Sequence, residues 1–276
     1  MEVNKIKNGV KISGVSDLDL AQTLDCGQSF RWVEENGKFS GVAYGKKVEI
    51  YYENDDLCID NTTSEDFEAV WREYLDLDLD YGKIRAEVSA LHPVLKEACA
   101  YAPGIRILRQ EPWEALCTFI ISQNNNIKRI KGIVGRLCES FGERIEDYYT
   151  FPSAEKLASL EAEDLAPIRA GFRNKYIIDA AQKVAGGEVN LEKCRTLEYE
   201  QARAELMKIK GVGVKVADCT LLFGLHRIEA FPVDVWMRRA LEKLFPDMTE
   251  NDFGDYAGIA QQYIFHYSRM HPELFE

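Results

Sequence analysis

Two residues of this sequence, Lys215 and Asp234, have types and settings that could carry out chemistry together. Lys215 follows the glycine-rich segment Gly211-Val212-Gly213 and opens an apolar-periodic segment that predicts a helix. A positive charge is electrostatically misplaced in the first turn of a helix, and nucleophilic chemistry needs a neutral amine. Asp234 follows a proline and precedes a second helical pattern. Amine attack beside a carboxylate is one interpretation, and a surface lysine with a helix-capping aspartate is the simpler one.

The segment Gly211-Val212-Gly213 must position Lys215. It joins the helical patterns at Ala204–Ile209 and Val216–Leu225, so the sequence predicts a tight helical hairpin at about 203–225. The first N–H groups of the second helix lack partners within the helix, and the helix dipole adds positive potential there. The hairpin therefore suits an anion such as a DNA phosphate, although an ordinary hairpin of two packed helices also fits these residues.

The order of these residues resembles a known family. Gly-Val-Gly-Val-Lys-Val-Ala-Asp-Cys followed by Pro-Val-Asp-Val is similar to the helix-hairpin-helix, Gly/Pro-Asp (HhH-GPD) motif of DNA glycosylases, and more closely to that of 8-oxoguanine DNA glycosylases with lyase activity. The resemblance implies that Lys215 attacks C1′ of the damaged nucleotide and that Asp234 supports the positive charge that develops. Relatives without lyase activity keep the aspartate and lack the lysine. Trp236 departs from the animal enzymes, which have a phosphate-binding histidine there.

The segment Leu24–Trp32 carries a second part of the resemblance, the motif Gly-Gln-Ser-Phe at Gly27–Phe30. Oxidation of guanine at C8 turns N7 into an N–H donor, so a lesion-specific pocket needs an acceptor aimed at N7. The family supplies that acceptor from the backbone carbonyl of the residue aligned with Gly27. From the residues alone, a glycine turn leading into a strand is the simpler interpretation.

Polar residues interrupt a helical pattern at Ser122-Gln123-Asn124-Asn125-Asn126, where a helix interior disfavours them. The resemblance implies that Asn124 enters the gap left by a flipped-out base and that Arg129 contacts the opposite cytosine, which has lost its pairing partner. Phe172 stands where the family commonly has a wedging tyrosine, and Arg173 aligns with a second cytosine-contacting arginine. For Arg129, a phosphate contact or a solvated surface position is the alternative.

Three further residues complete the lesion pocket that the resemblance implies. Gln261 and Phe265 lie four residues apart in a predicted helix from Tyr256 to Met270, so their side chains share one face. The family uses this pair to contact the guanine edge and to stack on the base. Cys219 lies one turn after Lys215 and would contact the lesion's other face. On periodicity alone, Phe265 and Cys219 would be core residues.

The chain has 276 residues and a net charge of −12, which at first disfavours a nucleic-acid partner. The acidic residues are concentrated, however. Positions 53–80 hold eleven acids and one base, whereas positions 106–136 hold six bases and two acids. Because salt screens charges over about 8 Å, a locally basic face can still bind DNA, with a steep salt response.

The seven cysteines are widely spaced and odd in number, which predicts free thiols in a reducing compartment. We therefore expect the protein in the cytoplasm, associated with the nucleoid if the source is prokaryotic. No cysteine follows Cys219, so the iron–sulfur cluster that some HhH glycosylases hold after the catalytic aspartate is not expected. We expect no metal, no organic cofactor, no secretory signal and no membrane segment. A monomer is expected.

The pattern predicts an α+β fold with an N-terminal antiparallel β-sheet domain (residues 1–100) and a mainly α-helical HhH-GPD core (residues 101–276). Strands are expected at Val3–Ile12, Phe30–Glu34, Lys38–Tyr44 and Lys46–Tyr52, with turns at Asn8-Gly9, Asn36-Gly37 and Tyr44-Gly45. A helix at Glu65–Tyr74, capped by Thr63 or Ser64, follows, and the remaining chain is predicted to be helical.

Together these observations predict a base-excision repair enzyme that removes 8-oxoguanine from double-stranded DNA, preferably opposite cytosine, and cleaves the resulting abasic site by β-elimination. Two alternatives stay open. One is a glycosylase of the same superfamily that acts on alkylated bases or mispaired adenine, which the Gly27 motif and the Gln261/Phe265 pair disfavour. The other is a non-catalytic HhH DNA-binding module, which would need neither Lys215 nor a base pocket.

Overall fold

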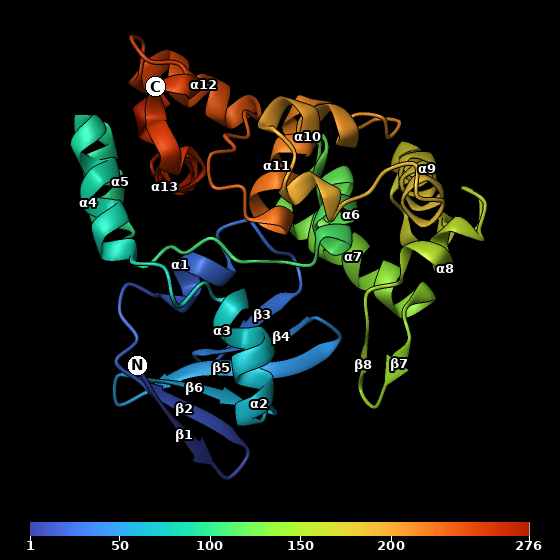
Figure 1. Cartoon of the computed structure of the whole chain (residues 1–276), viewed down its shortest axis with the longest axis horizontal. Helices are drawn as coiled ribbons and strands as arrows, with labels where there is room; N and C mark the ends of the chain where they lie inside the picture. The colour runs from blue at the N-terminus through green and yellow to red at the C-terminus, as the bar shows by residue number, and fades with distance from the viewer. Residues whose placement is uncertain (276) are drawn as a thin grey trace.

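The computed structural model describes residues 1–275, which form a β-sheet region and a larger helical region (Figure 1). The sheet lies at one end of the molecule, and the helices that follow it in the chain lie beyond it. The predicted α+β class, with an antiparallel sheet ahead of a helical core, is confirmed. No feature of the fold tests the division at residue 100, so that boundary stays a prediction.

Six antiparallel strands make one sheet in the order β1-β2-β6-β5-β4-β3. Their bounds are β1 Glu2–Ile6, β2 Gly9–Ser13, β3 Trp32–Glu35, β4 Lys38–Ala43, β5 Lys46–Glu53 and β6 Asp56–Asp60. The residues of the predicted turns at Asn36-Gly37 and Tyr44-Gly45 all have positive φ, as tight hairpins require. The register pairs Phe39 with Ile50 and Ile50 with Ile59, so apolar side chains meet across neighbouring strands.

Three strand predictions need correction. The segment Val3–Ile12 is a hairpin rather than one strand, with Gly9 as the first residue of β2. Glycine is required at this position because a Cβ would lie 1.9 Å from the Ile59 carbonyl oxygen. Phe30 lies outside β3 and packs with the helical core. Strand β6 was not predicted, although the turn at Asn54 and Asp55, both at positive φ, marks its start.

One face of the sheet is covered by a helical run from Ser64 to Tyr74, close to the predicted helix (Figure 1). Its parts are α2 Ser64–Asp66, a π-helical turn at Phe67–Trp71 and α3 Arg72–Tyr74. Thr63 caps it by accepting a hydrogen bond from Asp66 N. Trp71 and Tyr74 are buried against Trp32, so this run and the sheet share one hydrophobic core.

The helical region has a second core of its own, which also takes in Phe30. Its longer elements are α4 Tyr81–Leu91, α5 Pro93–Tyr101, α6 Pro112–Ser122, α7 Ile127–Phe141, α9 Asn174–Ala185, α10 Tyr199–Leu206, α11 Val214–Leu225, α12 Val235–Leu244 and α13 Ala257–Met270. Its shorter elements are the hairpin of β7 Arg144–Ile145 and β8 Tyr148–Tyr149, α8 Ala154–Ala158, and the 3₁₀ turns Ala166–Ile168, Gly171–Arg173, Lys193–Arg195, Glu250–Tyr256 and Pro272–Phe275. The short helix α1 Leu20–Leu24 instead buries Leu20 and Leu24 in the core of the sheet region.

Helix α11 is central to the helical region, where it packs along α6 (Figure 1). Every residue from Val216 to Leu225 is buried, so the helix is enclosed on all sides apart from its first turn, and its buried carboxylate, Asp218, is paired with Arg203. Close packing against α6 requires Gly224, because a Cβ there would lie 2.9 Å from the Ala115 methyl group and 3.1 Å from Pro112 Cα. The N-terminal turn of α11, which carries Lys215, is the part that is left accessible.

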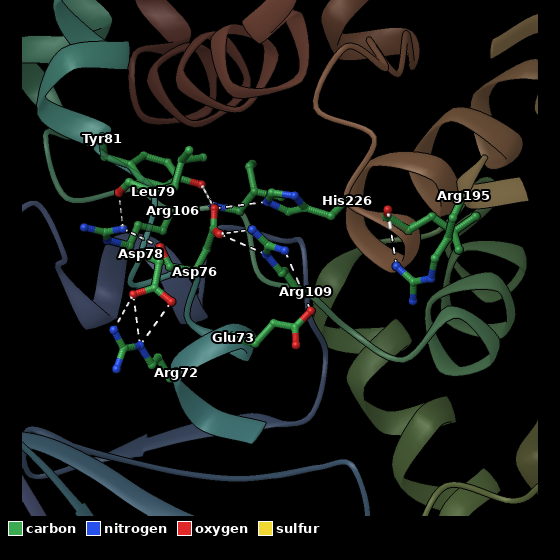
Figure 2. Close-up of polar contacts among 12 residues, drawn as sticks. Arg72, Glu73, Asp76, Asp78, Leu79, Tyr81, Arg106, Arg109, Arg195 and His226 are labelled. Carbon is green, nitrogen blue, oxygen red and sulfur yellow. Dashed lines mark hydrogen bonds and ion pairs between the residues drawn. The ribbon is translucent and has the colours of Figure 1, made fainter. Parts of the chain in front are cut away.

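A buried carboxylate ties the C-terminal end of α11 to the segment that leaves the sheet domain (Figure 2). Asp76 is 1% exposed and accepts hydrogen bonds from the Tyr81 hydroxyl at 2.9 Å and from Arg109 at 2.7 and 2.9 Å. His226, the residue after α11, places Nε2 3.0 Å from the same carboxylate. Burial alone would raise the pKa of Asp76, but the bonds from His226 and Arg109 outweigh it and lower that pKa. The helix that carries Lys215 is thus anchored at its far end.

Candidate active site

The hairpin between α10 and α11 has the predicted form. Gly211 has φ +81°, and a Cβ there would lie 2.5 Å from the ring of Tyr176. Both the backbone conformation and the close approach of Tyr176 therefore require glycine. Gly213 is the N-cap of α11 and provides no side-chain cap, and its Cβ position is open space. The first N–H groups of α11 are therefore available to an external acceptor, as an anion-binding hairpin requires.

Lys215 and Asp234 line the same cavity of about 240 Å³. Lys215 Nζ donates a hydrogen bond to Ser122 Oγ at 3.1 Å and lies 5.4 Å from the centre of the Phe119 ring. Asp234 caps α12, as its position after Pro232 predicted, and its Oδ1 accepts from Met237 N at 2.8 Å. Within residues 1–275 the two side chains form no ion pair with each other. The amine is thus held by a neutral hydroxyl at the mouth of a cavity that also contains a carboxylate.

The other predicted pocket residues line this cavity too. Gly27 has φ +94°, and an added Cβ would lie 3.2 Å from Ile127 Cδ1 and 3.5 Å from Phe265 Cε1. Gln261 is 5% exposed, and its Oε1 is buried without a hydrogen-bond partner. Such an orphan acceptor is costly unless a ligand satisfies it. Gly27, Phe265 and Gln261 therefore line one part of the cavity, called here the slot, which carries an unpaired amide oxygen.

Cys219 lies on the same face of α11 as Lys215 and also lines the cavity. Burial raises the pKa of its thiol to about 11, so the sulfur is a neutral thiol at neutral pH. A neutral, polarisable sulfur beside Phe223 and Phe119 suits contact with the face of a flat ring rather than nucleophilic attack. Lys215 is therefore the group in this cavity whose chemistry fits a nucleophile.

Four predicted residues meet at a second place, beside the cavity rather than in its wall. Helix α6 ends at Ser122, Asn124 has φ +48°, and Asn126 caps α7, so the polar interruption is a break between two helices. Asn124 and Arg129 are exposed, and the Phe172 ring is 50% exposed. These three side chains are free to meet a large ligand.

Arg173 differs from Arg129. It is 5% exposed, and its guanidinium lies 4.4 Å from the ring centre of Phe172. It donates to the carbonyls of Ala170 and Asn124 at 3.0 Å each and, through two nitrogens, to the carbonyl of Gln123. A guanidinium has five N–H donors, so these contacts use most of them. Arg173 thus holds the loop that presents Asn124.

Sequence reasoning missed several residues that the structure brings to the cavity. Ser122, which holds the Lys215 amine, lies 93 positions earlier in the chain. Gln262 is 2% exposed and lines the cavity beside Gln261, and two successive buried glutamines in an apolar helix are a signal that could have been noticed. Trp236, which the sequence singled out only as a departure from the family, also lines the cavity and is 44% exposed.

Other features of the described chain bear on cofactors and surroundings. All seven cysteines are free and buried. No group of three or more His, Cys, Asp or Glu side chains among residues 1–275 could hold a metal ion. A separate search of the same residues found no helix with the length and apolar character that crossing a membrane requires.

Comparison with known proteins agrees with this geometry. Residues 12–116 match the model of the 8-oxoguanine DNA glycosylase N-terminal domain, and residues 117–252 match that of the HhH-GPD superfamily of base excision DNA repair proteins. The N-glycosylase/DNA lyase of Saccharomyces cerevisiae is 36% identical over 259 residues, which are 83% of this chain and 68% of that protein.

Two solved structures are similar over almost their whole length. MBOgg1, solved with a low-affinity DNA ligand, is 44% identical with a TM-score of 0.94 over 98% of this chain and 99% of its own. The Clostridium acetobutylicum 8-oxoguanine glycosylase/lyase, solved with double-stranded DNA that contains cytosine opposite 8-oxoguanine, is 39% identical with a TM-score of 0.93 over 99% of both chains. One cavity is lined by the lysine after the hairpin, by the aspartate that caps α12 and by the predicted pocket residues, and both family models and the yeast relative match, so the chain belongs to the 8-oxoguanine DNA glycosylase/lyase family of HhH-GPD proteins.

Proposed function

We propose that this protein is a bifunctional DNA glycosylase and abasic-site lyase that removes 8-oxoguanine from duplex DNA, preferably opposite cytosine. The observation that carries the proposal is the cavity shared by Lys215 and Asp234 and walled by Gly27, Gln261 and Phe265. Membership of the family adds support, and the Clostridium acetobutylicum relative was solved with the lesion opposite cytosine.

Lys215 is the proposed nucleophile. Its neutral amine attacks C1′ as the bond from C1′ to the base breaks, and the base leaves with the bonding electrons. The nitrogen gives up a proton, the C1′–O4′ bond opens and O4′ takes up a proton, which leaves a protonated imine between Lys215 and C1′. This imine makes the neighbouring C2′ proton acidic, so loss of that proton forms a C2′–C3′ double bond, breaks the C3′–O bond, expels the 3′ phosphate and cuts the strand. Ser122 Oγ, 3.1 Å from the amine, directs Nζ into the cavity. Asp234 stabilises positive charge on the sugar as it develops.

The lesion base is proposed to enter the slot beside Gly27. The carbonyl of Gly27 accepts the N7–H that 8-oxoguanine has and guanine lacks. The unpaired Oε1 of Gln261 accepts hydrogen bonds from the amino and imino groups of the base edge. These bonds would remove the desolvation penalty of a buried oxygen that has no hydrogen-bond partner. Phe265 stacks on one face of the base and Cys219 contacts the other.

The opposite strand is proposed to meet the second group of residues. Asn124 and Phe172 fill the gap in the duplex, and Phe172 wedges without the hydroxyl of a tyrosine. Arg129 is exposed and offers donors that match the cytosine acceptors O2 and N3. Arg173 keeps the loop in place and has little donor capacity left for a base, so we assign it the smaller share of cytosine recognition.

The hairpin Gly211-Val212-Gly213 is the proposed phosphate contact on the damaged strand, because α11 has no side-chain cap there. We further propose a monomeric enzyme that works without metal, organic cofactor or iron–sulfur cluster. A cytoplasmic location, on the nucleoid if the source is prokaryotic, is supported by the free cysteines.

Borohydride trapping tests the function. The protein is incubated with duplexes that carry 8-oxoguanine, an alkylated purine, mispaired adenine or no lesion, each opposite the four bases, and borohydride reduces any imine to a stable protein–DNA adduct. We expect an adduct with 8-oxoguanine, most rapidly opposite cytosine. Trapping only with alkylated purine or adenine would favour the alternative glycosylase, and binding with no trapping at all would favour a non-catalytic module.

A further inference from the structure

The segment around Gly27 leaves one backbone carbonyl for a ligand. The carbonyl of Cys26 accepts a hydrogen bond from Gln262 Nε2 at 3.4 Å, and the carbonyl of Gln28 accepts from Gln110 Nε2 at 2.7 Å. In the part of the chain that the structure describes, the carbonyl of Gly27 accepts no hydrogen bond. The acceptors on both sides of it are therefore occupied, and that of Gly27 is left open.

The C-terminal side of Gly27 is fixed by a buried side chain. Gln28 is fully buried, and its Nε2 donates at 2.8 Å to the carbonyls of both Thr23 and Arg106. Its Oε1 accepts from Leu108 N at 2.9 Å. These bonds belong to the packing of the segment that joins the sheet to the helices, so Gln28 is a structural anchor whose orientation is determined by the fold.

The N-terminal side of Gly27 has a different kind of restraint. Gly27 has φ +94°, and glycine rotates about φ with little steric resistance, so the peptide before it needs a contact to stay in place. Gln262 provides that contact from α13, across 236 positions of sequence. The preceding residue, Gln261, presents its unpaired oxygen to the same cavity, and Phe265 lies one turn on. One helix thus aligns the base slot with the Gly27 peptide.

We propose that Gln262 is a positioning residue for lesion recognition, which acts by holding the Cys26–Gly27 peptide so that the Gly27 carbonyl faces the N7–H of 8-oxoguanine. This inference rests on the proposed function and adds a determinant of its specificity. Gln262 acts before the glycosidic bond breaks and has no part in the amine chemistry. Its loss therefore impairs base recognition and leaves strand cleavage at a base-free site largely intact.

The test separates these two steps with the full chain. Gln262→Met keeps the length of the side chain and removes the donor, and Gln262→Asn withdraws the donor by one methylene if the first variant fails to fold. The matched control is Ser268→Ala, because Ser268 is buried on the same helix, its hydroxyl has no hydrogen-bond partner and it does not line the cavity. Single-turnover rates are measured on 8-oxoguanine opposite cytosine and on a preformed abasic site.

Loss of one hydrogen bond that orients a recognition group is expected to slow 8-oxoguanine excision about tenfold in the Gln262 variants, with abasic-site cleavage within about threefold of wild type. On non-cleavable 2′-fluoro duplexes, the ratio of affinities for 8-oxoguanine and guanine falls by a similar factor. Ser268→Ala should match wild type in all three measurements.

Two results would overturn the inference. One is a Gln262 variant with wild-type excision and an unchanged affinity ratio. The other is a variant in which excision and abasic-site cleavage fall together, which would mean general damage to the fold. Both presuppose that wild type excises 8-oxoguanine, so a wild-type protein without that activity would refute the proposed function instead.

Discussion

The proposed lesion pocket and the surface proposed to face the opposite strand are built in different ways. Gly27, Gln261 and Cys219 lie in the wall of a cavity, come from three distant segments and are held by buried contacts. Asn124, Arg129 and Phe172 project from a break between helices and a short turn, and their side chains are largely exposed.

The difference corresponds to what each region must do. A pocket that distinguishes 8-oxoguanine from guanine by one hydrogen bond needs a preformed acceptor, since a mobile carbonyl could turn away from the N7 lone pair of guanine and so lose the repulsion that excludes it. A wedge has to enter a duplex, so its side chains must be accessible before DNA arrives. Changes in the pocket should therefore affect whether the lesion is excised, whereas changes in the wedge should affect which opposite base is preferred.

The largest effect is expected at the nucleophile. Lys215→Gln should abolish borohydride trapping and lower excision by on the order of 10³-fold or more, because no other amine lies in the cavity. Lesion-duplex affinity, measured by gel shift, should stay close to wild type. Lys210→Gln, which changes the lysine next to Gly211 in the hairpin, should keep trapping. Normal excision by Lys215→Gln would remove this residue from the mechanism.

Gly27→Ala should have the next largest effect. The added methyl would lie tightly against Ile127 and force a residue with a side chain to φ +94°, which is expected to displace the carbonyl from the lesion. A misplacement of this kind is expected to slow 8-oxoguanine excision about 100-fold, with abasic-site cleavage less affected. Gly45→Ala is the control, because Gly45 has φ +69° in a hairpin turn of the sheet domain. This variant should lower the free energy of unfolding and leave the excision rate of the folded protein unchanged. If Gly27→Ala lowered 8-oxoguanine excision and abasic-site cleavage by the same factor, the substitution would be acting on the protein as a whole rather than on base recognition in the pocket.

In the wedge, Arg129→Ala should compress the ratio of excision rates opposite cytosine and adenine. Adenine presents an amino donor where cytosine presents acceptors, and a good contact to a base edge contributes about 1–3 kcal/mol of discrimination. Single-turnover excision on four duplexes that differ only in the opposite base measures this ratio. Lys128→Ala, at the neighbouring exposed cation, should lower all four rates alike. Unaltered ratios would make Arg129 a phosphate contact or a surface charge.

Arg173→Ala tests whether the two arginines differ as their burial indicates. Its guanidinium holds the carbonyls of Gln123 and Asn124, so its loss should loosen the loop and slow excision about tenfold opposite every base, with a smaller change in the cytosine-to-adenine ratio than Arg129→Ala gives. The same four duplexes measure it. A larger change in the ratio than Arg129→Ala produces would instead make Arg173 the main cytosine contact.

The smallest effect is expected for Phe172→Tyr. The ring is half exposed and packs edge-on against Tyr176, and a hydroxyl at its tip adds little to wedging. Excision rates and the opposite-base ratio should change by less than about twofold, as surface changes usually do. A strong rise in cytosine preference would mean that the hydroxyl contributes directly to base recognition.

Local signals determined much of the fold. Asp234, Thr63 and Asn126 cap helices because a side chain that accepts from an N–H three residues ahead needs only nearby chain. The hairpins at Asn36-Gly37 and Tyr44-Gly45 follow from residues that tolerate positive φ. The roles proposed for the site residues came from the family resemblance. The position of Lys215 on the first turn of α11 followed from the glycines before it.

Only the tertiary structure decided the contacts that join distant segments. Ser122 holds the amine of Lys215, Gln262 holds the peptide before Gly27, and Asp76 anchors the end of α11 through His226. Each of these pairs is separated by more than 90 positions, and no local propensity encodes which polar group will face another across a packed interface. The exposed Arg129 and the buried Arg173 are the same residue type, and packing against the loop of Asn124 is what makes Arg173 a support of that loop while Arg129 stays exposed.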